Sequence, residues 1–237
     1  MEPQDYCVID LEMTGLSASD RIIEVGAVRV RGGEACDTFS SLINPGREIP
    51  PQVEALTGIS NSMVQNAPPV DEVIPEFLEF IGSDVLVGHN VSFDYRFLKQ
   101  WAVNHNHPLE PNFLDTLKIA RKLLPEEQSK KLGDLCRYFA IGQERKHRAV
   151  DDALATACLL ECLKQLAVPE TDGSIWQPKP IAIRVKKQSP ATKHQIQRLQ
   201  EYMQQHAISD EIAWETLTKS EASRITDKYR AQYGNDG

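Results

Sequence analysis

Three strand-like stretches open the chain, and they restrict its fold more than any other feature of the sequence. Tyr6–Glu12 is a short apolar run that ends before Thr14-Gly15. Ile22–Arg31 is rich in β-branched residues, and the glycine pair at 32 and 33 predicts a hairpin turn into Ala35–Ile43. We therefore expect a sheet that begins with three consecutive strands.

Helical patterns follow, with one more strand among them. Asp115 is expected to cap a helix that Pro125 stops. A short helix is expected after Pro50-Pro51, through Leu56. Further helices are expected at Ser60–Gln65, Val70–Ile81, Ser92–Trp101, Thr116–Leu124, Leu132–Phe139 and Ala149–Leu166, and a buried strand at Val85–Val87. Strands first and then an alternation with helices predict an α/β domain with a mixed sheet.

The remaining sequence predicts a linker and a small helical module. We divide the chain into a domain at 1–168, a basic, proline-containing linker at 169–190 and a helical module at 191–233. Thr192 with Gln195, and Thr218 with Glu221, form capping-box patterns at the starts of two helices. A module of about 45 residues is too small to be very stable alone.

Composition narrows the class of protein. The 237 residues are 41% hydrophobic and 25% charged, and no apolar run is long enough to cross a membrane. The first residues lack the basic and apolar regions of a secretory signal. Five cysteines without a C-x-x-C spacing favour buried free thiols over disulfides or a zinc site. We therefore expect a cytoplasmic protein with no membrane partner.

The net charge of −8 argues against broad binding of duplex nucleic acid, although the charge is uneven. Residues 1–168 carry a net charge of −9 and residues 169–237 a net charge of +1. Five basic and no acidic side chains lie between Lys179 and Lys193. Two interpretations stay open for this stretch: a solvated linker, or an arm that follows phosphates.

Four acidic residues and one histidine carry the chemistry. Asp10 and Glu12 alternate with Leu11, so their side chains share one face of the first strand. Asp94 and Asp152 are expected in the first turns of two helices, and His147 lies five residues before Asp152. Alone, each acid fits a strand edge or a favourable helix N-terminus, and a lone loop histidine is usually solvated. Together they predict a cage of oxygen ligands for two hard divalent cations, Mg²⁺ or Mn²⁺.

Two such cations about 3.5–4 Å apart promote phosphodiester cleavage, so this set is typical of a nuclease. In this interpretation Asp10, Glu12 and Asp152 hold the cation near the attacking water. Asp10 also bridges to the second cation, which Asp94 reaches near the leaving 3′ oxygen. His147 takes the proton of the water, because an unperturbed histidine has a pKa of about 6.5 and can accept a proton near neutral pH.

The same residues and their surroundings resemble the DEDDh exonucleases, the DnaQ-like family of the RNase H-like fold, over roughly residues 5–168. This family includes the proofreading epsilon subunit of bacterial DNA polymerase III. Further matching segments are Ile43-Asn-Pro45, Leu56-Thr-Gly-Ile59, Ala67-Pro-Pro69, Val87-Gly-His-Asn90 and the pattern formed by His147, Ala149 and Asp152. The spacing of His147 points to the histidine subclass.

The resemblance implies removal of nucleoside 5′-monophosphates from the 3′ end of a single strand. It further implies that the backbone at Met13 and Thr14 holds the terminal 3′-hydroxyl, and that Leu16 and Thr57 touch the last nucleotide. Asn90 and Phe93 would line the path of the strand, and aromatic stacking on bases tolerates any sequence.

Two departures leave alternatives open. Met13, within the segment Asp10–Leu16, is closer to the oligoribonucleases, so RNA remains a second substrate class. No polymerase domain accompanies the domain in this sequence, which favours a free-standing enzyme over a proofreading subunit. A polymerase or another replication or repair protein remains a candidate partner. The alternative of another class is a binding module without turnover, and the intact set of five residues argues against it.

Overall fold

The computed structural model describes residues 2–17, 19–143, 147–166, 173–210 and 212–234. The chain forms two compact units: Met1–Lys99 with Pro108–Arg184, and Gln100–His107 with Val185–Gly237. The predicted boundary at residue 168 lies outside the described residues, and the three-part division stays a prediction. Among the described residues, no helix combines the length and the apolarity needed to cross a membrane.

A mixed sheet forms the centre of the first unit, as expected. Its strands are β1 (Tyr6–Met13), β2 (Ile22–Arg31), β3 (Glu34–Leu42), β4 (Leu86–Gly88), β5 (Asn112–Asp115) and β6 (Lys179–Pro180), in the order β3-β2-β1-β4-β5-β6. The first three strands are antiparallel, whereas β4 and β5 run parallel to β1. The carboxyl ends of β1, β4 and β5 therefore lie at one edge of the sheet.

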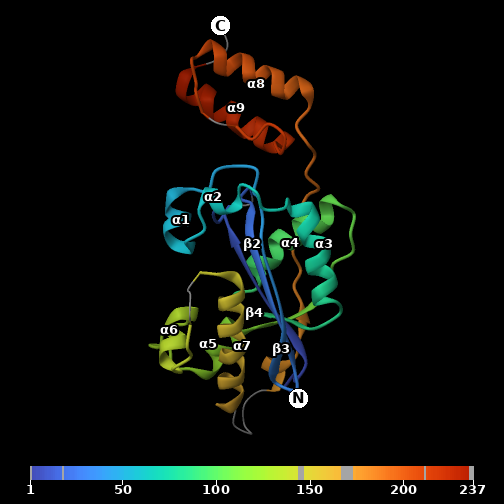
Figure 1. The fold of residues 1–237 in the computed structure, drawn as a ribbon, viewed down its shortest axis with the longest axis vertical. Coiled ribbons are helices and arrows are strands. Elements are labelled where there is room, and N and C mark those ends of the chain that lie inside the picture. The colour runs from blue at the N-terminus through green and yellow to red at the C-terminus, as the bar shows by residue number, and fades with distance from the viewer. Residues whose placement is uncertain (1, 18, 144–146, 167–172, 211, 235–237) are drawn as a thin grey trace. The chain divides into compact units, whose positions relative to one another are not determined.

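The central helix α7 (Ala149–Gln165) covers one face of this sheet. Tyr6 and Val8 on β1, and Val28 and Val30 on β2, pack in one core with the apolar residues of α7. Because strand residues alternate in direction, Asp10, Glu12, Glu24 and Gly26 point to this same face. Figure 1 shows α7 lying along the strands, with α5 (Thr116–Leu123) and α6 (Leu132–Tyr138) beside it.

The predicted helices are present with small shifts at their ends. The remaining helices of the first part of the chain are α1 (Pro51–Thr57), α2 (Asn61–Val64), α3 (Val70–Ile81) and α4 (Ser92–Asn104). Gly58 ends α1 at φ 68°, and Pro75 lies inside α3, five residues after its start. Asp115 caps α5, since its carboxylate accepts a 3.1 Å hydrogen bond from the amide of Leu117.

Two of the strands were not predicted from the sequence. The strand β5 has four residues, and β6 has two and pairs with it in antiparallel register. Between the described residues 173 and 180, a 3₁₀ turn at Gly173–Trp176 buries Trp176 in the core next to α7. The linker expected from 169 therefore belongs, in its described part up to Arg184, to the first unit.

The second unit contains α8 (Lys193–Gln205) and α9 (Lys219–Tyr233), which begin with the two predicted capping boxes. Their shared core consists of Leu199, Tyr202, Met203, Leu217, Ala222 and Tyr229. The basic stretch is tied to the unit, because the amide of Gln188 donates to Asn104 at 2.8 Å and Nζ of Lys187 donates to Asn106 at 2.9 Å.

All five cysteines are free thiols, as the sequence predicts. The expectation that they are buried is correct for Cys7 and Cys136 and wrong for Cys36 and Cys158, which are exposed. Cys36 lies on the edge strand β3, and Cys158 lies on a turn of α7 that the core leaves uncovered. The apolar neighbours of Cys158 in sequence therefore indicated the wrong environment.

Candidate active site

Asp10 and Glu12 stand at the end of β1, on the face covered by α7. Both side chains are partly exposed, although the neighbouring residues Leu11 and Met13 are buried. Opposite them on β2, Asp10 pairs with Gly26 and Glu12 pairs with Glu24. A Cβ on Gly26 would lie 2.3 Å from the backbone of Ala149, so this glycine lets the first turn of α7 reach the two acids.

Asp94 reaches the site from the first turn of α4. Its side chain is buried, and Oδ1 accepts a 3.1 Å hydrogen bond from the amide of Leu11, between Asp10 and Glu12. The carboxylate is thereby fixed against the backbone of β1. Among the neighbouring charges, that of Asp94 raises the pKa of Asp10 most.

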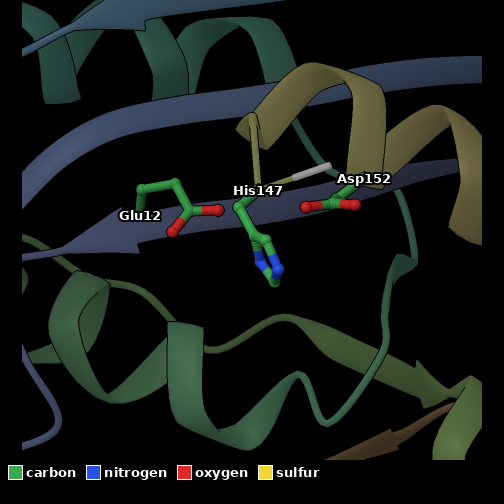
Figure 2. Close-up of side chains that lie close together, drawn as sticks. All are labelled: Glu12, His147 and Asp152. Atoms are coloured by element: carbon green, nitrogen blue, oxygen red, sulfur yellow. The ribbon is translucent and has the colours of Figure 1, made fainter. Parts of the chain in front are cut away.

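His147 and Asp152 approach from the start of α7. One ligand atom from each of Glu12, His147 and Asp152 lies within 4.8 Å of the other two. Figure 2 shows His147 between the two carboxylates, with Glu12 on its strand and Asp152 on the helix. His147 is exposed and adopts φ 58°, whereas Asp152 is buried and accepts a 2.6 Å hydrogen bond from Nε2 of Gln143.

Burial and mutual repulsion raise the pKa values of the clustered acids. Burial, followed by the charges of Asp94 and Glu12, raises the pKa of Asp10 well above its usual range. Burial, followed by the charge of Asp152, raises the pKa of Glu12 to about 8. Burial is also the main cause that raises the pKa of Asp94 to about 7 and that of Asp152 to about 6.

This arrangement fits divalent cations. Carboxylates that crowd one another become stable in the ionised form when a positive charge lies between them. Oxygen donors from two strand positions and two helix starts suit hard divalent cations. The structure thus brings together all five residues that the sequence predicts for the chemistry.

The last residue of β1 and the loop after it contain three of the residues expected to bind substrate. Met13 and Thr14 are buried, whereas Leu16 is 79% exposed. The amide of Thr14 already donates to the carbonyl of Arg21 at 2.8 Å, so a terminal hydroxyl would have to share that amide or use other backbone atoms. Leu16 is held through its carbonyl, which accepts a 3.0 Å hydrogen bond from Nη2 of Arg96.

Thr57, Asn90 and Phe93 come from three other segments. Thr57 is buried, and its hydroxyl donates to the carbonyl of Val53 at 2.9 Å and accepts from Ile59 at 3.1 Å. Asn90 is exposed at φ 67°. The ring of Phe93 is partly exposed, and the guanidinium of Arg96 lies 5.2 Å from its centroid. The roles of these residues toward a nucleotide stay predictions.

Sequence reasoning missed residues that support the site. Asp115, predicted only as a helix cap, also accepts a 2.9 Å hydrogen bond from the amide of Asn90 and so fixes the turn before α4. Glu24 and Arg148 form an ion pair beside Glu12, with a distance of 2.6 Å between Oε1 and Nη2. A glutamate within a predicted strand carries no signal of such a role, since most glutamates are exposed.

Comparison with known proteins identifies relatives of this chain. The exonuclease family model matches residues 7–160, which is more than half of the chain. The PolC-type DNA polymerase III of Clostridium perfringens is 42% identical over 158 residues, which are 66% of this chain and 11% of that protein. The PolC-type enzyme of Bacillus subtilis is 44% identical over 174 residues, or 70% of this chain and 12% of that protein. The chain therefore spans about a tenth of the length of these relatives.

Solved structures share the architecture. Exonuclease X, in complex with 5′ overhanging duplex DNA, matches with a TM-score of 0.58 and 29% identity over 73% of this chain and 99% of that chain. The nuclease domain of 3′hExo, a DEDDh family member bound to rAMP, matches with a TM-score of 0.61 and 19% identity over 74% of this chain and 96% of that chain. The second likeness concerns the fold alone. With the family match and the clustered acids, these findings show that the chain belongs to the DEDDh exonucleases.

Proposed function

We propose that this protein is a metal-dependent 3′→5′ exonuclease that releases nucleoside 5′-monophosphates from single-stranded DNA. One observation carries the proposal: ligand atoms of Glu12, His147 and Asp152 lie within 4.8 Å of one another, beside two further acids. Two divalent cations, Mg²⁺ or Mn²⁺, are the proposed cofactors. When bound, they would orient water and neutralise charge on the scissile phosphate.

The protein's own residues divide the remaining work. Asp10, Glu12 and Asp152 would bind one cation, and Asp10 and Asp94 the other. His147 is exposed beside Glu12 and Asp152, where its ring can accept the proton of an attacking water. The loop that contains Leu16 and the ring of Phe93 would hold the terminal nucleotides.

The relatives with the higher sequence identity favour DNA as the substrate. The PolC-type relatives are DNA polymerases, and Exonuclease X was solved with DNA. One observation supports RNA as a second candidate, since the nuclease domain of 3′hExo was solved with rAMP. Replication or repair proteins are the proposed partners. The free thiols support a reducing, cytoplasmic location.

The test is digestion of matched single-stranded DNA and RNA oligonucleotides, labelled at the 5′ end, with Mg²⁺ or Mn²⁺. We expect a ladder that shortens from the 3′ end, faster on DNA, and mononucleotides that carry a 5′-phosphate by chromatography. Preference for RNA would move the protein to the second candidate function. Chelation of the metal is expected to stop both reactions.

A further inference from the structure

A fully buried carboxylate connects β2 with the start of α7. Glu24 is 0% exposed, and it lies directly across the strand pair from Glu12. Its oxygens accept from Nε of Arg148 at 3.1 Å each, and Oε1 also accepts from Nη2 at 2.6 Å. Oε2 accepts a further hydrogen bond of 2.9 Å from the amide of Ala149.

These contacts fix the backbone on which two proposed active-site residues lie. Arg148 occupies the cap position of α7 and makes no capping hydrogen bond through its own side chain. Glu24 provides the missing acceptor from another strand, where the positive end of the helix favours a negative charge. His147 precedes this cap with φ 58°, and the amide of Asp152 bonds to the carbonyl of Arg148 at 2.9 Å.

The same contacts distinguish Glu24 from the acids that would bind the cations. Both of its oxygens are already engaged by donors from Arg148 and Ala149, whereas Asp10 and Glu12 keep part of their surface accessible. A buried ion pair is in itself weak evidence for stability, because desolvation of the charges offsets their attraction. Its place between β2 and α7 suggests a geometric role.

We propose that Glu24 and Arg148 are positioning residues that hold His147 and Asp152 in register with Glu12. This inference rests on the proposed nuclease function. A residue misplaced by about 1 Å can cost about 10²-fold in rate even when substrate still binds. Loss of the pair should therefore lower kcat and leave KM for the oligonucleotide nearly unchanged.

The experiment compares kcat and KM of the full chain on single-stranded DNA at saturating Mn²⁺. Glu24→Gln is expected to lower kcat by about 10- to 100-fold, with KM within about twofold of the wild type. If this variant does not fold, Arg148→Lys provides the same test, because it keeps the charge and loses the paired contact. Asp84→Asn is the matched control, since it breaks the 2.7 Å ion pair with Arg31 on the same strand β2, away from the acids, and should leave kcat unchanged.

A double variant distinguishes a positioning role of the pair from a stabilising role. Glu24→Met with Arg148→Met replaces the buried pair by apolar side chains, a change that often preserves stability. We expect a melting temperature at or above that of Glu24→Gln, with kcat still low. Recovery of kcat together with the melting temperature would overturn the inference, as would a Glu24→Gln enzyme with kcat within about twofold of the wild type. A wild-type protein without nuclease activity would instead refute the proposed function.

Discussion

The amide of Leu11 donates a 3.1 Å hydrogen bond to Oδ1 of Asp94, across 83 positions of sequence. This bond joins the backbone between Asp10 and Glu12 to the first turn of α4. It therefore fixes an acid from a distant part of the sequence against the two acids that share a strand. The hydrogen bonds to Asp94 favour its ionised form, yet burial outweighs them and raises its pKa to about 7.

The crowded acids predict that the metal-free protein loses stability as the pH rises. A carboxyl whose pKa is higher in the folded state favours folding in its protonated form, so this contribution is lost as the pH rises through the folded pKa. The relevant pKa values are about 6 for Asp152, about 7 for Asp94 and about 8 for Glu12. Thermal unfolding in a chelator should therefore show a melting temperature that falls between about pH 5 and pH 9.

Divalent cations should reverse this trend. A ligand that binds only the folded state adds about 2.7 kcal/mol at a concentration 100 times its Kd. Addition of Mn²⁺ at pH 8 should raise the melting temperature more than addition at pH 5.

A metal-free protein whose melting temperature does not change between pH 5 and pH 9 would contradict the first of these two predictions. It would show that the four acids are not coupled in the folded state.

Substitution of His147 tests whether it is a base or a ligand. His147→Ala should lower kcat by about 10²–10⁴, the usual contribution of a general base, because the carboxylates remain to bind the cations. Titration of Mn²⁺ by electron paramagnetic resonance should give a similar affinity for the variant and the wild type. A large loss of Mn²⁺ affinity would instead make His147 a ligand, which its distance of at most 4.8 Å from the ligand atoms of Glu12 and Asp152 also allows.

Gly26→Ala should damage both stability and activity. The added methyl group would lie 2.3 Å from the carbonyl carbon of Ala149 and from the amide nitrogen of Val150, so α7 has to move away from β2. Such overpacking typically costs about 1–3 kcal/mol, and here it would also displace Asp152. Denaturant unfolding and kcat measure the two effects.

Gly133→Ala provides the matched control. This glycine lies inside α6, and nothing lies within 4 Å of a Cβ placed on it. Alanine should therefore preserve activity and stabilise the helix by about 0.5–1 kcal/mol. Equal behaviour of the two variants would contradict the close approach of α7 to β2.

The basic stretch predicts a contribution to binding of the strand. Lys186→Gln with Lys187→Gln should raise KM on long oligonucleotides and leave kcat unchanged. Each phosphate contact on a single strand contributes a slope of about −0.7 in log K against log salt, so loss of two contacts should flatten the slope by about 1.4. Lys122→Gln, an exposed lysine on α5, is the control. An unchanged salt slope would favour a role in docking to a protein.

The sequence predicted the long elements and the five clustered residues, because each depends on a local signal. The alternation Asp10-Leu11-Glu12 fixes one face, and helix starts orient Asp94 and Asp152. The strand β5 was missed since its four residues, Asn112–Asp115, are too few for an alternation to appear. Its place depends on pairing with β4, which local sequence does not encode.

The contacts of Glu24 were not predicted for a related reason. Its partners Arg148 and Ala149 lie more than 120 positions away, and the contact exists only once α7 packs on β2. The burial of Trp176 has a similar cause, because the prolines near it indicate a linker and only packing against the core buries its side chain. Long-range packing decides both cases, and neither is visible in a window of sequence.

The most direct test of the central claim follows the products from single-stranded DNA with a 5′ label and Mg²⁺ or Mn²⁺. The wild type should shorten the strand from its 3′ end and release nucleoside 5′-monophosphates. Asp10→Ala should do neither and keep its melting temperature in chelator, because removal of one crowded carboxylate relieves repulsion. Near-normal digestion by folded Asp10→Ala, or products that begin from the 5′ end, would contradict the account.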